Sequence, residues 1–95
     1  MKKTVVIILL LAFAACTTKI YLPTDANVNK RETASLADLQ QGHDIFKAKC
    51  GKCHGYKKPE KYSSAQWTKI LQKMGPKAKL DKDQVSLVYK YVVNF

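Results

Sequence analysis

The segment Cys50-Gly51-Lys52-Cys53-His54 constrains this chain more than any other feature. Two cysteines stand three positions apart, and a histidine follows the second one directly. This is the spacing of a c-type haem attachment site, in which each thiol forms a thioether and the adjacent imidazole binds the iron. We therefore predict that Cys50 and Cys53 hold one haem c covalently and that His54 is the proximal iron ligand.

Two other interpretations of the cysteine pair stay open beside this one. Cys50 and Cys53 could form half of a zinc site, but a second ligand pair with zinc spacing is missing, and upstream of the motif only His43 remains. They could also form a redox dithiol, which requires a strand–helix–strand context that the flanking sequence does not have. The haem interpretation is favoured because it also accounts for His54.

Length and charge bound the function. A chain of 95 residues is enough for one small domain, and a covalently held haem would add an apolar core piece to it. The formal net charge is +10, and removal of Lys2 and Lys3 with a leader would leave +8. The lysines are scattered and do not cluster on a reading helix, so we expect an acidic redox protein as partner and no nucleic acid. The alternative is a solvated lysine coat.

The first 15 residues have the pattern of a secretory signal peptide. Residues 1–3 are a positive start, and residues 4–14 form an apolar stretch too short for a comfortable membrane span. Phe13-Ala14-Ala15-Cys16 resembles the lipobox of bacterial lipoproteins, which implies that Cys16 becomes the lipidated first residue. We then expect a membrane-anchored protein facing the periplasm or the cell exterior. The alternative is an ordinary export signal with an unpaired cysteine.

The rest of the chain divides into a tether and a helical domain. Residues 16–33 contain Pro23 and no sustained periodicity, so we predict a lipidated N-terminus and a flexible tether before a domain at 34–95. The sequence leaves open whether Tyr21 and Leu22 lie near the bilayer or fold back on the domain.

Three helices are predicted in the domain, each from a capping residue followed by apolar positions at helical spacing. The first begins at Ser35 and runs to about Lys49. The second begins at Ser63 and is stopped by Gly75-Pro76, and the third begins at Asp81. No alternating strand pattern is present, so the predicted fold class is all-α. The apolar stripes are Trp67, Ile70, Leu71 and Met74 on the second helix, and Val85, Val88, Tyr89 and Val92 on the third, where Leu87 and Tyr91 form a second face.

From about Ser35 to Phe95 the chain resembles a small monohaem class I cytochrome c. Gly42-His43-Asp44-Ile45-Phe46 resembles the N-terminal helix of that family, and Leu87-Val88-Tyr89-Lys90-Tyr91-Val92 resembles its C-terminal helix. The resemblance implies a fold of about three helices around the haem, in which the terminal helices cross at the glycine and the aromatic residues interlock.

The resemblance also implies a distal iron ligand, usually a methionine in the loop just before the C-terminal helix. Met74 lies seven residues before the expected cap Asp81, although it could equally complete the apolar stripe as a core residue. His43 is a poorly placed rival, and we expect it to be a solvated or helix-capping histidine. By resemblance, the Pro59 carbonyl would accept a hydrogen bond from the proximal histidine. Trp67 is expected to fill the core.

These features predict a one-electron carrier, not an enzyme, and a monomer that shuttles electrons between respiratory partners. His/Met ligation closes both axial positions of the iron, which leaves electron transfer as its chemistry. The alternative is a haem-based ligand-binding or sensor module with an open or weakly held distal site. Docking would use the lysines that flank the motif and the distal loop, namely Lys52, Lys57, Lys58, Lys73, Lys77 and Lys79.

Overall fold

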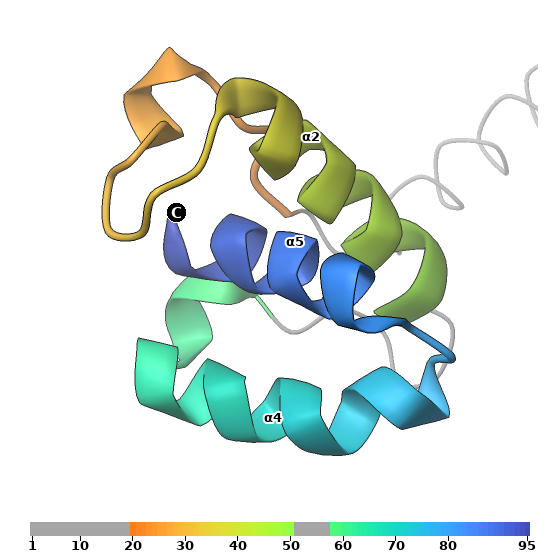
Figure 1. The fold of residues 1–95 in the computed structure, drawn as a ribbon. Helices are drawn as coiled ribbons and strands as arrows, with labels where there is room; N and C mark the ends of the chain where they lie inside the picture. The colour runs from red at the N-terminus through yellow and green to blue at the C-terminus, as the bar shows by residue number, and fades with distance from the viewer. Residues whose placement is uncertain (1–19, 51–57) are drawn as a thin grey trace, which may run out of the picture.

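Three α-helices carry the fold in the computed structural model, which describes residues 20–50 and 58–95 (Figure 1). They are α2 (Leu36–Ile45), α4 (Ser64–Lys77) and α5 (Lys82–Val93). Two 3₁₀ turns, η1 (Asp25–Asn27) and η3 (Pro59–Lys61), and one π-helical turn, η2 (Phe46–Cys50), complete the secondary structure. The described residues include no strand, and the predicted all-α class is confirmed.

Each α-helix begins directly after its predicted capping residue, because each start is fixed by a capping box. Ser35 accepts a hydrogen bond from the Asp38 backbone N–H at 3.1 Å, and the Asp38 carboxylate accepts one from the Ser35 N–H at 3.3 Å. The same reciprocal bonds join Ser63 to Gln66 and Asp81 to Gln84. These bonds satisfy backbone donors that the first helical turn leaves unpaired.

The end of α4 differs from the prediction that Gly75-Pro76 stops this helix. Pro76 lies inside the last turn, where its missing N–H costs one hydrogen bond, and the helix continues to Lys77. The chain then turns at Lys79, which has a left-handed φ of 60°. The Lys79 N–H donates to Pro76 O and the Leu80 N–H to Gly75 O, which is the hydrogen-bond pattern of a Schellman motif.

Helix α5 lies between the other two helices, with α2 on one side and α4 on the other (Figure 1). The crossing of α2 with α5 is very close at Gly42. A Cβ atom added there would lie 2.1 Å from Leu87 O and 2.8 Å from Tyr91 Cβ, so only glycine permits this approach. The Phe46 and Tyr91 rings meet beside it with centroids 5.8 Å apart. The predicted crossing of the two helices at the glycine, with Phe46 and Tyr91 in contact, is confirmed.

The core forms where α5 meets its two neighbours. Because α5 is covered on both sides, Tyr91, which the sequence assigns to a second face, is fully buried like Val88 and Val92 of the predicted main face. From α4, Trp67 and Leu71 are buried. The cluster comprises Phe46, Trp67, Leu71, Val88, Tyr91, Val92 and Val93.

Residues 20–33, predicted as part of a flexible tether, lie along the end of α5. The Tyr21 ring stacks on the Tyr91 ring at 4.4 Å, and each hydroxyl donates to the backbone carbonyl of the other tyrosine. Asn94 is fully buried, and its Oδ1 accepts from the N–H groups of Arg31 at 2.7 Å and Glu32 at 3.0 Å. Specific hydrogen bonds therefore hold this segment on α5. The segment is polar, which suggests a tether, but some of its polar groups form these bonds.

Candidate cofactor-binding site

Helix α2 leads directly into the cysteine motif. Its last turn widens into the π-helical turn η2, where the Phe46 N–H donates to the carbonyls of both Gly42 and His43. Such turns are frequent at functional sites. Cys50 is the last residue of η2, is half-buried and packs against the core cluster. The first motif cysteine is thus placed at the border of the core, whereas Cys53 and His54 lie outside the described residues.

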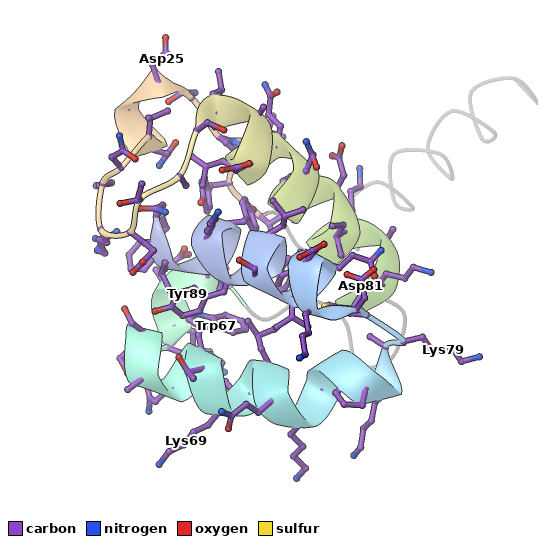
Figure 2. All side chains as sticks on the ribbon, viewed as in Figure 1. Asp25, Trp67, Lys69, Lys79, Asp81 and Tyr89 are labelled. Carbon is purple, nitrogen blue, oxygen red and sulfur yellow. The ribbon has the colours of Figure 1, made fainter. Side chains whose placement is uncertain are left out.

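Trp67 lies at the centre of the structure that follows the motif. Figure 2 shows its ring reaching from α4 towards α5, and its side chain is almost fully buried. Its Nε1–H donates to the Pro59 carbonyl at 2.9 Å, while the rings of Tyr62 and Phe46 meet it edge-on at 5.3 Å and 6.0 Å. The expectation that Trp67 fills the core is confirmed. Its hydrogen bond also fixes η3 on the core directly after the motif.

Pro59 itself is buried, and its carbonyl accepts from Trp67. A carbonyl oxygen has two lone pairs, so this bond is compatible with the second bond expected from the proximal histidine. His54 is outside the described residues, and that hydrogen bond stays a prediction.

Met74 lies in the third turn of α4 and not in a loop. It is half-buried, and its carbonyl accepts from the Ala78 N–H at 2.9 Å. Ile70, one turn earlier, packs against the core cluster, but Met74 is not among the partly buried side chains of the described segments that do so. Its place on the inward-facing side of α4 after Trp67, Ile70 and Leu71 leaves the thioether compatible with a ligand role.

His43 is buried, which corrects the expectation of a solvated or helix-capping side chain. Its ring meets the Tyr91 ring edge-on with centroids 5.4 Å apart, and its Nδ1 lies 3.0 Å from Asp44 Oδ1. The reason is that α2 crosses α5 so closely at Gly42 that the next residue also lies in the crossing. His43 is therefore a packing residue between two helices.

Charged groups are unevenly distributed among the described residues. The α4 sequence contains no Asp or Glu, and Lys69, Lys73 and Lys77 recur every four residues along it, all of them exposed. Of the predicted docking lysines, Lys58 and Lys79 are also exposed, and Lys52 and Lys57 lie outside the description.

Within residues 20–50 and 58–95, no group of three or more His, Cys, Asp and Glu side chains is arranged to hold a metal ion. In the same ranges, no helix is long and apolar enough to cross a membrane. The predicted signal peptide at 1–15 and the predicted lipidation site Cys16 precede the described part of the chain. Comparison with protein-family models, curated proteins and solved structures finds no match to this chain.

The sequence interpretation left open whether Tyr21 folds back on the domain, and the structure places it there, against Tyr91. It did not anticipate the partner Tyr91 or the role of Asn94. Asn94 follows the last residue of α5, where an asparagine is ordinary, and no local pattern marks its bonds to Arg31 and Glu32. The only available signal was residue type, because Tyr21, Tyr91 and Asn94 all have side chains that can donate and accept hydrogen bonds.

Proposed function

We propose that this protein is a one-electron carrier of the c-type cytochrome class, exported and anchored to a membrane through Cys16. One observation carries the proposal. The α2–α5 crossing at Gly42, with Phe46 against Tyr91, has the arrangement that the resemblance to class I cytochromes c implies, and the same helix α2 leads through η2 to Cys50. The attachment motif thus begins at the border of the core, directly after the helix that crosses α5 at Gly42.

The residues divide the work of holding a haem. Cys50 and Cys53 would form the thioethers, and His54 and Met74 would supply the two protein ligands of the iron. The haem would supply one-electron exchange between ferric and ferrous iron. The chain contributes a low-dielectric wall of Phe46, Trp67 and Leu71, which are all buried, and a rigid helix pair that keeps the attachment site fixed. No proton transfer or bound substrate is required, so the protein is proposed to be a carrier and not an enzyme.

Docking to the electron donor and acceptor would be electrostatic. The exposed lysines of α4 form a face without acidic residues, which suits an acidic protein surface, fast association and fast release. A lipid anchor would confine the search for partners to the membrane surface. We propose that the carrier works as a monomer.

The deciding experiment is the optical spectrum of the exported, membrane-purified protein in both oxidation states, together with its intact mass. We expect the sharp bands of a low-spin c-type haem in the reduced form, and a mass that includes one haem and a lipid. A colourless protein whose mass equals the polypeptide plus lipid would overturn the haem assignment. Expression must take place in a host with haem-attachment machinery, because a host without it would yield only the bare chain.

The second candidate is a haem-based ligand-binding or sensor module. The position of Met74 inside α4, instead of in a loop, favours it, because a helix limits how far a side chain can adjust to the iron. A high-spin ferric spectrum and rapid CO binding by the unmodified protein would select this function. A low-spin spectrum with slow or no CO binding would select the carrier.

Replacement of Met74 separates the two functions at one residue. In the carrier, Met74→Ala should lower the reduction potential by on the order of 0.1 V or more, because the axial ligand tunes the potential strongly, and should open the iron to CO. Ile70→Ala is the matched control, since it shortens a half-buried side chain one turn earlier on α4 without removing sulfur. Redox titration and CO binding are the measurements. An unchanged potential in Met74→Ala would remove this residue from the ligand role.

A further inference from the structure

Leu22 is an apolar side chain left in solvent at a rigid position. Among residues 20–50 and 58–95, Leu22 is the one large hydrophobic side chain that is exposed, with 72% of its surface accessible to solvent. Its neighbour Tyr21 is fixed on Tyr91 by ring stacking and two hydrogen bonds. A fixed backbone therefore presents Leu22 outward, beside a shallow hollow of about 380 Å³ that it shares with Pro23, Gln40, His43 and Asp44.

The length of chain before this point limits where the domain can go. Only five peptide steps separate Cys16 from Tyr21, which span at most about 17 Å when fully extended. A flexible connection as long as residues 16–33 would allow any orientation. Because residues 20–33 are docked on α5, this part of the chain cannot serve as a long flexible connection.

We infer that the surface around Leu22 and Pro23 contacts a lipid bilayer and that the docked segment holds the domain in one orientation on it. This inference rests on the proposed lipidation of Cys16. Apolar side chains held next to a lipid anchor gain free energy by leaving water for the bilayer.

The other side of the molecule fits this orientation. Leu22 lies beside α2, whereas α4 lies on the far side of α5 (Figure 1). In Figure 2, Asp25 of η1 and Lys69 of α4 stand at opposite ends of the domain. Asp44 also lines the hollow next to Leu22, and its carboxylate would not attract anionic lipid headgroups. The proposed contact with lipid therefore depends on the apolar side chains of Leu22 and Pro23. The lysine face of α4 is then directed away from the bilayer, where an acidic partner can reach it.

Spin labels on the full-length lipidated protein, bound to phosphatidylcholine vesicles, test this orientation. Labels are placed singly in Leu22→Cys, Asp44→Cys and Lys73→Cys, and collisions with oxygen and with a water-soluble nickel complex are compared. We expect the labels at positions 22 and 44 to be at least threefold less accessible to nickel than the label at 73. Equal accessibility at all three positions on vesicle-bound protein would overturn the inference but leave the proposed anchor intact.

Two further results separate the inference from the function on which it rests. Tyr21→Ala should release the start of the segment, which carries Leu22, from α5. The label at 44 should then become as accessible to nickel as the label at 73, and an unchanged label at 44 would contradict orientation by the docked segment. A mass without lipid, together with protein that stays in solution when mixed with vesicles, would remove the proposed anchor and this inference with it. The haem spectrum would be unaffected by that outcome.

Discussion

Gly42 determines how closely α2 and α5 approach, and the contact is with backbone atoms that cannot rotate away. Replacement by alanine would place the new Cβ 2.1 Å from Leu87 O. Because the helices must separate to admit it, Gly42→Ala should lower the free energy of unfolding by about 3 kcal/mol. Gly75→Ala is the control: its Cβ would meet only the Val85 Cγ2 methyl, at 3.0 Å, and alanine gains up to about 1 kcal/mol in a helix. Urea unfolding of the haem-loaded protein measures both variants, and equal stability of Gly42→Ala and the parent would contradict the crossing.

Tyr21 and Tyr91 form a pair whose protonation is linked to folding. Burial raises the pKa of each hydroxyl above its usual value of about 10. Above that pH, the unfolded chain loses protons that the folded protein keeps, so the free energy of unfolding should fall as pH rises. The stabilisation is complete below about pH 10 and is lost progressively above it.

The measurement for this pair is the unfolding free energy between about pH 8 and about pH 11.5. Tyr21→Phe and Tyr91→Phe should each make the alkaline decline shallower, by up to about 1.4 kcal/mol per pH unit for a proton fully retained in the folded state. Below pH 9 the slopes of parent and variants should coincide. Parallel curves over the whole range would show that neither hydroxyl is linked to folding.

At the scale of the elements, helix starts could be predicted and helix ends could not. Each start depends on a capping residue and its partner three positions later, so the information is local. The end of α4 was predicted at Gly75-Pro76, but proline removes only one hydrogen bond. The helix ends where Lys79 adopts a left-handed conformation, and a lysine in the sequence does not predict that conformation. The first helix was likewise predicted to run to about Lys49, but α2 ends at Ile45 and is followed by the π-helical turn η2, which has no sequence signature.

Lys79 should be improvable for this reason. A non-glycine residue in the left-handed region lowers the stability of the folded state by about 1 kcal/mol or more. Glycine removes this strain, but part of the gain is lost because glycine gives up more conformational entropy on folding. Lys79→Gly should therefore raise the free energy of unfolding by about 0.5–1 kcal/mol. Lys77→Gly removes the same charge inside α4 and should lower the stability by about 1 kcal/mol. Thermal unfolding compares the two. A Lys79→Gly protein no more stable than Lys77→Gly would rule out the Schellman ending.

For the whole molecule, the helical class followed from the periodicity of apolar residues and the Gly42 crossing from the resemblance to class I cytochromes c, whereas the role of residues 20–33 was not predicted. Helical periodicity reports a buried face, but this segment docks through a tyrosine pair and through Asn94, whose partners are more than 60 residues away in sequence. Contacts of that range leave no period to detect. The candidate site was predictable as far as its motif, because the attachment spacing is local, but the burial of His43 depends on the crossing of two distant helices.

The docked segment makes a prediction about where the folded unit begins. If residues 20–33 were a tether, a chain starting at residue 34 would be as stable as one starting at residue 20. In the structure, removal of the segment uncovers Tyr91 and leaves the Asn94 amide oxygen without the two backbone donors it accepts from. Together these losses should lower the free energy of unfolding by at least about 3 kcal/mol.

Urea unfolding should compare the two chains, each loaded with haem and placed behind the same export leader without a lipidation cysteine. Asn94→Ala in the longer chain should reproduce part of the loss, because it leaves the same two backbone donors unpaired. Its effect should be smaller in the shorter chain, where those donors are already gone and only the bond from Asn94 Nδ2 to Lys90 O is removed. Equal midpoints for the two chains would restore the tether and place the boundary of the domain at residue 34.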